Sequence, residues 1–363
     1  MPPEYLRATL VTLAALVIAA VASPLAGRLG RRLGLVDKPG GRRQHRGLVP
    51  RIGGLGLFAG FFVTALGVYF LGPIQEAHRL PFVGVLLGAA VVCVFGLLDD
   101  RYQLKAAPQF AIQFGAAFIA IATTVFIEQV TLPIFGFRDF NEEGLRWLVT
   151  YPLTVAWIVG MMNTVNFLDG LDGLAAGVGA IAAVVFAVHS YSLGQPDIAL
   201  FSLALAGACV GFLAFNLHPA RVFLGSAGAM TLGYALATLS ILAPARVATA
   251  LLVMAIPITD TAFQMFDRWR RGQSPAQGDR GHLHFRLMDL GLSQKQIVVG
   301  YWVFCGVFGA LALVISAPIY KLIAIGALGV IVVIVLLGLS RTRPRGSQGA
   351  QQTQDSSAKD ASE

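Results

Sequence analysis

Long apolar runs are the feature that most limits what this chain can fold into. About eleven runs of roughly 20 residues recur along the sequence, which is the length that a helix needs to cross the hydrocarbon core of a bilayer. Hydrophobic residues make up 56% of the chain and charged residues 13%, whereas charged residues reach about 25% in soluble domains. The sequence therefore predicts an all-α polytopic membrane protein without a large water-soluble domain. The predicted spans begin near Tyr5, Ile52, Pro81, Pro108, Trp147, Leu174, Ile198, Met230, Val247, Ile297 and Pro318.

The distribution of basic residues predicts the orientation of these spans. With the N-terminus outside and the C-terminus cytoplasmic, all but six of the 27 Lys and Arg residues fall on the cytoplasmic side. Because Lys- and Arg-rich loops stay on that side during insertion, we expect this orientation in the cell inner (cytoplasmic) membrane. The net charge of +8 then faces anionic headgroups and phosphate ligands, and no basic domain of the kind that binds nucleic acid is present. The six outer residues are Arg7, Arg79, Arg138, Arg146, Arg246 and Lys321.

The composition changes after the last apolar run. Residues 1–341 form the predicted membrane domain, and residues 342–363 are rich in Gln, Ser and Gly. A segment of that composition cannot bury enough apolar surface to fold alone, so we predict a disordered cytoplasmic tail. The three cysteines lie inside apolar spans, which argues against a disulfide framework or a thiolate metal site.

The segment 163–173, Asn-Thr-Val-Asn-Phe-Leu-Asp-Gly-Leu-Asp-Gly, is the most unusual polar stretch. Asn163, Asn166, Asp169 and Asp172 are three residues apart, so they would cover about half of a helix circumference. The intervening glycines let the backbone turn and approach a ligand closely. Such an acidic, amide-rich corner suits a hard cation together with a phosphate or sugar. The simpler alternative is a polar loop that caps two membrane helices.

The third predicted span ends in two adjacent carboxylates, Asp99 and Asp100. Two carboxylates at the end of an apolar run repel each other and are desolvated, so one stays protonated unless a cation offsets the charge. A solvated helix end is the alternative interpretation. Upstream, the basic run 42–45 and the segment Pro50-Arg51-Ile52-Gly53-Gly54 combine Arg and His with Gly-rich backbone. That combination can hold phosphate groups, although Arg at a helix end can also serve topology alone.

Two later cytoplasmic loops carry further candidate residues. The loop before the eighth span contains Phe223 beside small residues, which suits stacking on a flat base but also occurs in ordinary packing. The last large loop reads Gly-Asp-Arg-Gly-His-Leu-His-Phe-Arg and includes Arg280, His282 and His284. Paired histidines with nearby cations suit a diphosphate or nucleotide. Zinc is the alternative ligand, but no third or fourth soft ligand lies near the pair.

In this order, these cytoplasmic motifs resemble the polyprenyl-phosphate N-acetylhexosamine-1-phosphate transferases, and the resemblance covers about residues 37–296. The Asp-Asp pair, Asn-x-x-Asn-x-x-Asp-Gly-x-Asp-Gly and Gly-Asp-Arg-Gly-His-x-His together make it specific. The segments 50–54 and 279–284 are closest to the UDP-GlcNAc:undecaprenyl-phosphate GlcNAc-1-phosphate transferases. The phospho-MurNAc-pentapeptide transferases are the alternative branch, but they usually carry three contiguous histidines, from which Leu283 and Phe285 depart.

The resemblance implies an enzyme that transfers a sugar 1-phosphate, GlcNAc-1-phosphate in the nearest branch, from a UDP-sugar to polyprenyl (undecaprenyl) phosphate. The products would be a lipid-diphosphate-sugar and UMP, at the start of a cell-envelope polysaccharide such as lipopolysaccharide or teichoic acid. The implied cofactor is Mg²⁺, with Mn²⁺ as an alternative, and a homodimer is compatible with the family. By similarity, the catalytic carboxylates would be Asp99 and Asp100, and the metal ligands Asn166, Asp169 and Ser226. The nucleotide and diphosphate contacts would be Arg51, Asn163, Asp172, Phe223, Arg280, His282 and His284.

One departure from the family pattern concerns the metal. The family has Phe-x-Gly-Asp-x-Gly-Ser before the corresponding span, with the Asp a Mg²⁺ ligand, whereas this chain has Ser226 at that position. Serine can offer a hydroxyl but removes a full negative charge. Mg²⁺ could then shift toward Asp169 or Asp172, bind more weakly until substrate completes its shell, or serve a catalytically impaired homologue. A basic residue expected early in the fourth span is also missing, since Pro108-Gln109-Phe110 stands there, although Lys105 could substitute.

A transporter or flippase for a lipid-linked sugar, or a non-catalytic scaffold, is the rival function. Transporters place their polar binding residues near the bilayer midplane between broken helices. Here the polar residues gather at the cytoplasmic ends of spans, with Asp260 the main exception. That distribution favours an enzyme at the membrane interface, and it leaves the identity of the sugar and the pathway open.

Overall fold

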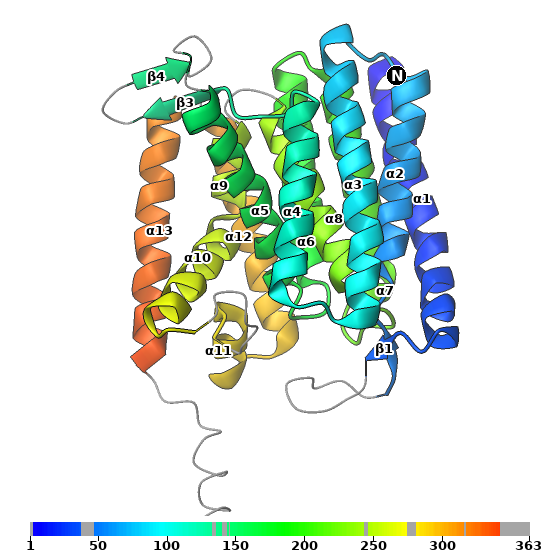
Figure 1. The fold of residues 1–363 in the computed structure, drawn as a ribbon, viewed down its shortest axis with the longest axis vertical. Helices are drawn as coiled ribbons and strands as arrows, with labels where there is room; N and C mark the ends of the chain where they lie inside the picture. The colour runs from blue at the N-terminus through cyan, green and yellow to red at the C-terminus, as the bar shows by residue number, and fades with distance from the viewer. Residues whose placement is uncertain are drawn as a thin grey trace, which may run out of the picture.

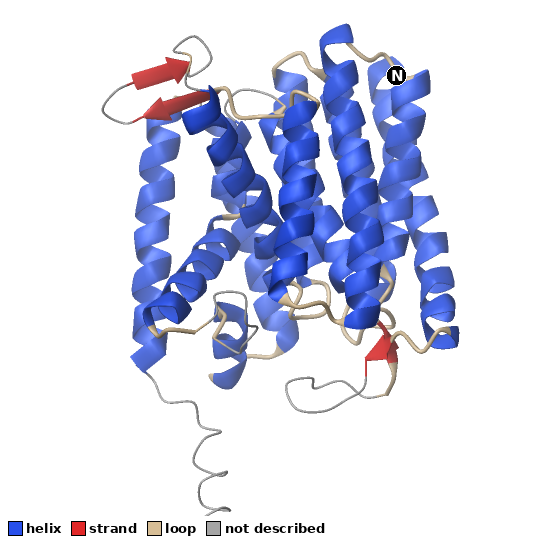
Figure 2. Cartoon of the chain, in the orientation of Figure 1, coloured by secondary structure: helices blue, strands red, loops and turns tan. Residues whose placement is uncertain are grey.

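The computed structural model describes residues 3–37, 47–132, 136–139, 144, 146–242, 246–273, 281–315 and 317–341, and it is almost entirely helical in these ranges (Figures 1 and 2). Three sequence predictions lie outside the described residues: Arg280, the basic run 42–45 and the tail 342–363. The elements are α1 (Pro3–Arg32), β1 (Val36–Asp37), β2 (Val49–Pro50), α2 (Gly54–Leu71), α3 (Glu76–Tyr102), α4 (Ala106–Ala122), β3 (Gln129–Leu132), β4 (Gly136–Asp139), a π-helix (Arg146–Thr150), α5 (Tyr151–Leu168), α6 (Leu174–Ser192), α7 (Pro196–Asn216), α8 (Gly225–Ile241), α9 (Arg246–Val253), α10 (Ala255–Arg270), α11 (Leu283–Asp289), α12 (Gln294–Val314) and α13 (Pro318–Arg341).

Each predicted apolar run coincides with a helix, so the prediction of an all-α polytopic membrane protein is confirmed. Among the described residues, eight helices are long and apolar enough to cross a membrane, and the bent pair α9–α10 would be a ninth. The helices α4 and α8 have 17 residues each, slightly short of the roughly 20 that a straight span requires. The count of eleven spans therefore stays a prediction, and so does the orientation. The N-terminus and the end of α13 lie at opposite ends of the bundle (Figure 1).

Small residues set how closely α1 approaches its neighbours α2 and α7. A Cβ atom on Gly211 of α7 would lie 2.2 Å from the carbonyl oxygen of Leu16, and one on Gly60 of α2 would lie 2.7 Å from that of Ala15. Without side chains at these positions, the backbones touch, which is how membrane helices associate in the absence of a hydrophobic driving force.

The helix α8 lies at the centre of the bundle, and nearly all of its side chains are buried. Its first turn contacts both α2 and α3 through glycines. A Cβ on Gly54 would lie 2.2 Å from the carbonyl oxygen of Leu224, and a Cβ on Gly96 would lie 2.4 Å from the Cα of Ala227. These contacts bring the N-terminus of α8 against the end of α3, where Asp99 and Asp100 lie.

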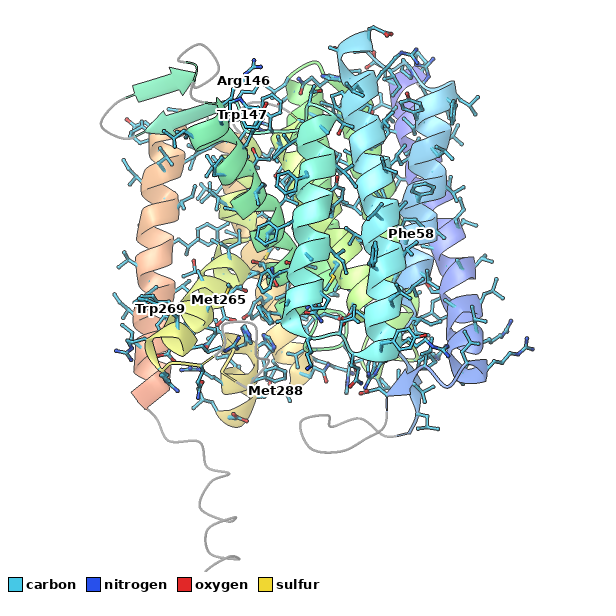
Figure 3. The ribbon with its side chains drawn as sticks, in the orientation of Figure 1. Phe58, Arg146, Trp147, Met265, Trp269 and Met288 are labelled. Carbon is cyan, nitrogen blue, oxygen red and sulfur yellow. The ribbon has the colours of Figure 1, made fainter. Side chains whose placement is uncertain are left out.

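The helices α9 and α10 meet at an angle of 83°. Beyond the bend, α10 reverses the usual amphipathic arrangement: Asp260 and Gln264 are buried, whereas Phe266 and Trp269 are exposed. An apolar outer face with a polar inner face fits a helix whose surroundings are lipid. Trp269, on α10, and Trp147, at the opposite end of the bundle (Figure 3), lie at levels typical of the aromatic residues that border a membrane.

Candidate active site

A cavity of about 880 Å³ lies where the ends of several helices and loops meet. Five parts of the chain line it: the β1–β2 region, the end of α3 with the start of α4, the α5–α6 connection, the α7–α8 connection, and the segment leading into α11 with Gln294. All of these belong to the same end of the bundle, although they are up to about 250 residues apart in the sequence. The structure brings together nine predicted site residues on this wall: Arg51, Asp99, Asp100, Asn166, Asp169, Asp172, Phe223, Ser226 and His282.

Asp99 and Asp100 occupy the last turn of α3 and are both buried, but they have different partners. Asp99 Oδ1 accepts hydrogen bonds from the backbone N–H of Leu104 at 2.9 Å and from Gln109 Nε2 at 2.8 Å. Gln109 thus supplies a neutral donor at the position where a basic residue was expected. These bonds use one oxygen of Asp99, and both partners lie on the cavity wall.

Asp100 instead binds the N-terminus of α8. Its Oδ1 accepts the backbone N–H of Ser226 at 2.8 Å, and its Oδ2 accepts that of Ala227 at 3.1 Å. The first N–H groups of a helix have no partner within the helix and carry the positive end of its dipole. Asp100 therefore anchors α8 to α3, and the substituted Ser226 lies directly against this carboxylate.

Asp169 also reaches the start of α8, where it accepts a hydrogen bond from the backbone N–H of Gly225. Burial raises the pKa of Asp169 well above its ordinary value, and the charges of Asp100 and Asp172 raise it further, whereas the bond from Gly225 opposes the shift. Gly225 has φ +69°, and a Cβ on it would lie 2.1 Å from the carbonyl oxygen of Arg51. Only glycine fits this position, so Asp100 and Asp169 can both reach the N-terminus of α8.

Asp172 ties the α5–α6 connection to the α7–α8 connection. Its Oδ2 lies 2.8 Å from His218 Nδ1 and accepts the backbone N–H of Ala220 at 3.1 Å. Asn216 adds a second tie, since it accepts the N–H of Gly173 and donates to the carbonyl oxygen of Val222, both at 3.0 Å. The sequence analysis gave no role to His218 or Asn216, because an isolated His or Asn in a loop has no distinctive pattern.

The pair of short strands carries Arg51 to the cavity wall, with its carbonyl oxygen against Gly225. β1 and β2 are antiparallel, with Val36 opposite Pro50, and Arg51 Nε donates to Asp37 Oδ1 at 2.8 Å. The backbone N–H of Phe223 donates to the carbonyl oxygen of Pro50 at 2.9 Å, which holds the half-buried Phe223 beside the same strands. The sequence analysis did not identify Asp37 as a lining residue, because its partner Arg51 lies 14 residues away.

His282 lies on the wall and is almost fully buried. Its Nδ1 is 2.9 Å from Asp260 Oδ2, its Nε2 is 3.4 Å from Arg268 Nη2, and its ring stacks on Phe167 with the centroids 5.0 Å apart. The sequence analysis noted Asp260 as an isolated intramembrane acid. The only signal in the sequence for the contact with His282 is that an ionisable residue inside a membrane segment usually pairs with another polar group.

The structure does not place Asn163 and His284 on the cavity wall. Asn163 Nδ2 donates at 2.8 Å both to Gln113 Oε1, on α4, and to the carbonyl oxygen of Val159. His284 is buried behind Gly170, and burial lowers the pKa of its imidazole to about 3. The regular spacing that singled out Asn163 holds only while the helix continues, and α5 ends at Leu168, so residues beyond that point turn to a different side.

The donor atoms on the wall fit a hard cation only in part. Among the described residues, no group of three or more His, Cys, Asp or Glu side chains is arranged to hold a metal ion. However, five carboxylates line the cavity, and Arg51 is the one Arg or Lys among the described lining residues. Mg²⁺ commonly binds through one or two carboxylates and completes its shell with water and substrate phosphates. Oxygen ligands such as those of Asn166 and Asp169 fit that mode of binding.

Comparison with known proteins identifies the family of this chain. Residues 82–244 match the model of glycosyl transferase family 4. The chain is 33% identical to a probable undecaprenyl-phosphate N-acetylglucosaminyl 1-phosphate transferase of Bacillus subtilis over 86% of both chains. It is also 33% identical to a decaprenyl-phosphate N-acetylglucosaminephosphotransferase of Mycolicibacterium smegmatis, over 93% of this chain and 90% of the relative. An undecaprenyl-phosphate alpha-N-acetylglucosaminyl 1-phosphate transferase of Escherichia coli is 30% identical over 76% and 74% of the two chains. The family predicted from the motifs is therefore confirmed, and the chain belongs to glycosyl transferase family 4.

Proposed function

We propose that the protein transfers N-acetylglucosamine 1-phosphate from UDP-N-acetylglucosamine to a polyprenyl phosphate in the cell inner membrane. An oxygen of the lipid phosphate attacks the β-phosphorus of the donor, and the bond from that phosphorus to the bridging oxygen of UMP breaks. One observation supports this reaction above the others: Asp99, Asp100 and Asp169 share a cavity with Asn166 and Arg51 at one end of the bundle. The names of the relatives supply the sugar and the lipid.

The main physical task is to hold two anions close enough to react. Phosphoryl transfer requires positioning and charge neutralisation rather than covalent chemistry from the protein. The wall itself is acidic, so a cation must accompany the diphosphate. Bound Mg²⁺ would supply that charge, and Asn166 and Asp169 are the residues proposed to hold it. The N–H groups at the start of α8 stabilise the negative charge of the carboxylates that accept their hydrogen bonds.

Asp99 is the better candidate for the catalytic base. Both oxygens of Asp100 accept N–H groups of α8, whereas Asp99 accepts its bonds from Leu104 and Gln109 through Oδ1. Asp99 Oδ2 is thus suited to take a proton from the lipid phosphate as that phosphate attacks. Asp100 is proposed to keep α8 and its neighbours in register with the reacting groups.

The nucleotide is proposed to lie on the side of Phe223 and Arg51. Phe223 is half-buried on the wall and offers a ring face for the uracil. Arg51 reaches the cavity and can donate to the diphosphate, and the ring of His282, whose nitrogens contact Asp260 and Arg268, forms part of the same wall. No role is proposed for Asn163 or His284 in contacting the ligand, because neither is on the wall.

The test is transfer of labelled GlcNAc-1-phosphate from UDP-GlcNAc to undecaprenyl phosphate by the purified full chain, with and without Mg²⁺. We expect metal-dependent release of UMP, a loss of about 10²–10⁴-fold in kcat for Asp99→Asn, and unchanged kcat for Asp197→Asn. Asp197, on α7, is a matched control, because it is also a buried aspartate but contacts His78 at the far end of α3. Activity of Asp99→Asn equal to that of the parent would refute the role of this carboxylate.

Ser226→Asp tests the departure from the family pattern in the same assay. The new carboxylate would lie beside Asp100 and Asp169 and add a negative charge to the metal environment. We expect turnover to be kept or raised and half-maximal activity to need about tenfold less Mg²⁺, which corresponds to about 1.4 kcal/mol. An inactive parent together with an active Ser226→Asp variant would instead identify this chain as a catalytically impaired homologue.

A further inference from the structure

The buried face of α10 carries polar residues at a regular helical interval. Asp260, Gln264 and Arg268 are four residues apart, so they lie on one side of the helix. Their exposed fractions are 4%, 2% and 2%. Burying a carboxylate, an amide and a guanidinium in a membrane protein is costly unless each has a partner. The hydrogen-bond partners of this polar row, Asp260, Gln264 and Arg268, therefore indicate its role.

All three residues of this polar row contact the same short segment, Gly281–Leu283. Asp260 Oδ1 accepts the backbone N–H of Leu283 at 3.0 Å, and Asp260 Oδ2 lies 2.9 Å from His282 Nδ1. Gln264 Nε2 donates to the carbonyl oxygen of Gly281. Arg268 Nη2 lies 3.4 Å from His282 Nε2. The row thus holds the backbone on both sides of His282 as well as both nitrogens of its ring.

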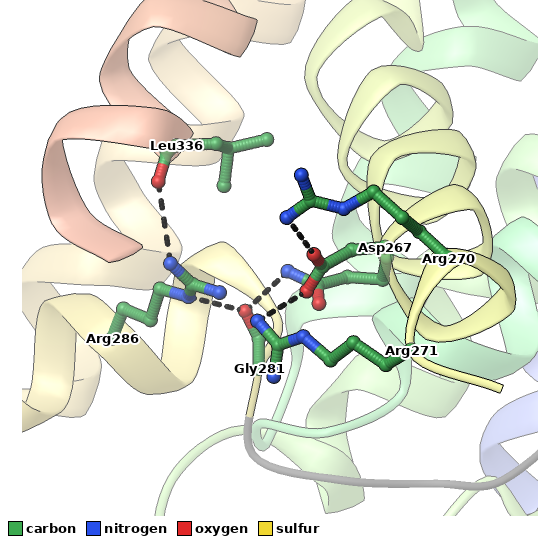
Figure 4. Close-up of polar contacts among 7 residues, drawn as sticks. Asp267, Arg270, Arg271, Gly281, Arg286 and Leu336 are labelled. Atoms are coloured by element: carbon green, nitrogen blue, oxygen red, sulfur yellow. Dashed lines mark hydrogen bonds and ion pairs between the residues drawn. The ribbon is translucent and has the colours of Figure 1, made fainter. Parts of the chain in front are cut away.

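The segment is also fixed from its other side. Arg286 Nε donates to the carbonyl oxygen of Gly281, and Arg286 Nη1 donates to that of Leu336 at 3.2 Å (Figure 4). Asp267, next to the row, pairs with Arg271 at 2.6 Å and with Arg270 at 3.4 Å. The ends of α10, α11 and α13 are therefore connected around Gly281, which restricts where His282 can lie.

These contacts select one form of the imidazole. A carboxylate can only accept hydrogen bonds, so the contact with Asp260 requires the hydrogen on Nδ1. Nε2 then presents its lone pair toward the guanidinium of Arg268, which can only donate. Phe167 stacks on the ring at an interplanar angle of 30°, and Arg268 lies 5.6 Å from the centre of the Phe167 ring. Ring position and tautomer are therefore determined together.

We propose that Asp260, Gln264 and Arg268 are positioning residues that hold His282 in its Nδ1–H tautomer on the wall of the active site. None of the three lines the cavity, so they act through His282 and not on the substrate. A neighbouring carboxylate that orients a functional histidine is a recurring device in enzymes, because the tautomer decides which ring nitrogen donates and which accepts. The inference rests on the proposed function, in which His282 forms part of the wall that contacts the donor diphosphate.

A double-mutant cycle on the full chain tests the coupling. We expect Asp260→Asn to lower kcat by about 10–100-fold, the range seen when a partner that orients a ligand-binding histidine is removed. Asparagine keeps the shape but offers one acceptor in place of two. In the His282→Gln background, Asp260→Asn should cause no further loss, because the asparagine oxygen can still accept the backbone N–H of Leu283 and the imidazole partner is already gone. Losses that multiply in the double variant would overturn the proposal.

Three other variants separate positioning from general destabilisation. Gln264→Met removes one donor at constant volume, and we expect a loss of about fivefold in kcat, typical of one hydrogen bond. Thr261→Val changes a buried neighbour on α10 for which no bond to Gly281–Leu283 exists among the described contacts, and Asp197→Asn breaks the other buried Asp–His pair. Both controls should keep the kcat of the parent. If Thr261→Val loses as much activity as Asp260→Asn, the loss in Asp260→Asn reflects disturbed folding of α10 and the positioning role fails.

The tautomer itself can be observed without turnover. In protein labelled with ¹⁵N in the imidazole rings, the signal of His282 is identified by its disappearance in His282→Gln. We expect the Nδ1–H pattern in the parent and its loss in Asp260→Asn. The same pattern in both proteins would overturn the proposal. If His282→Gln is fully active while the spectra change as expected, the role of His282 on the diphosphate fails but its positioning by Asp260 stands.

Discussion

Neighbouring residues with the same side chain have different tasks in this protein because their partners differ. Asp99 is bound by a backbone N–H and an amide at the start of α4, whereas Asp100 is bound by the first N–H groups of α8. His282 and His284 show the same contrast. The ring nitrogens of His282 have partners on α10, whereas neither ring nitrogen of His284 has a partner among the described residues.

His284 leads to a prediction about pH. Its pKa is about 3 in the folded protein against about 6.5 in an unfolded chain. The unfolded state therefore binds the extra proton, and the stability contributed by the neutral ring is present above pH 6.5 and is lost as the pH falls toward 3. Between pH 7 and 5 the loss is about 2 kcal/mol.

We expect the melting temperature of the parent in detergent to fall over this pH range and to fall less steeply in His284→Leu. At pH 7 the leucine variant should be at least as stable as the parent, because it removes two buried nitrogens that lack partners. An identical dependence of melting temperature on pH in the two proteins would contradict the burial of an uncharged ring at this position.

The sequence revealed residues whose type is unusual for their surroundings. Asp99, Asp169 and His282 stand out because charged or titratable groups are rare beside apolar runs. Asp37, Gln109 and His218 also line the cavity, but single residues of these types are ordinary near the ends of helices and in connecting segments. Asn163 shows the opposite case: its spacing fits the motif, and its side chain donates to Gln113 across the contact between α4 and α5.

At the scale of elements, apolar length predicted the helices but not the bend. The run beginning near Val247 reads as a single span, whereas the structure breaks it after Val253. The polar row of α10 explains the difference, because Asp260, Gln264 and Arg268 find partners only if the helix turns toward Gly281. Since these partners follow a separate loop, the bend depends on tertiary contacts that a local pattern does not contain.

The close contact between α2 and α8 gives a prediction at this scale. Gly54→Ala places a methyl group about 2.2 Å from the carbonyl oxygen of Leu224 and 2.4 Å from the Cα of Gly228. Because both contacts are with backbone, α8 must move, and its N-terminus carries the bonds to Asp100 and Asp169. We expect a loss of at least about tenfold in kcat and about 1–3 kcal/mol in stability.

Gly67→Ala on the same helix is the matched control, since a Cβ at that position meets nothing within 4 Å. It should leave both quantities as in the parent, measured by UMP release and by thermal unfolding. Full activity in Gly54→Ala would show that the start of α8 need not be held against α2.

At the scale of the whole molecule, the prediction concerns orientation. The α6 helix begins at the active-site end and finishes at Ser192, whereas α12 begins at that end with Gln294 and Lys295. Ser192 and Lys295 are both exposed. A membrane-impermeant maleimide applied to intact cells should label Ser192→Cys but not Lys295→Cys, and permeabilised cells should show both.

The parent is a suitable background, because Cys93, Cys209 and Cys305 are buried and should not react. Labelling of Lys295→Cys in intact cells would place the active-site end outside and contradict the positive-inside prediction.

The position of the cavity at one end of the helices has a further consequence. In the proposed reaction, donor, acceptor and metal all meet there, so the sugar would be attached on the same leaflet from which the nucleotide arrives. Nothing in such a reaction carries the hydrophilic head of the glycolipid through the bilayer. If the finished polysaccharide is displayed on the cell surface, the energy and the machinery for turning the lipid over must come from a separate protein that accepts this product.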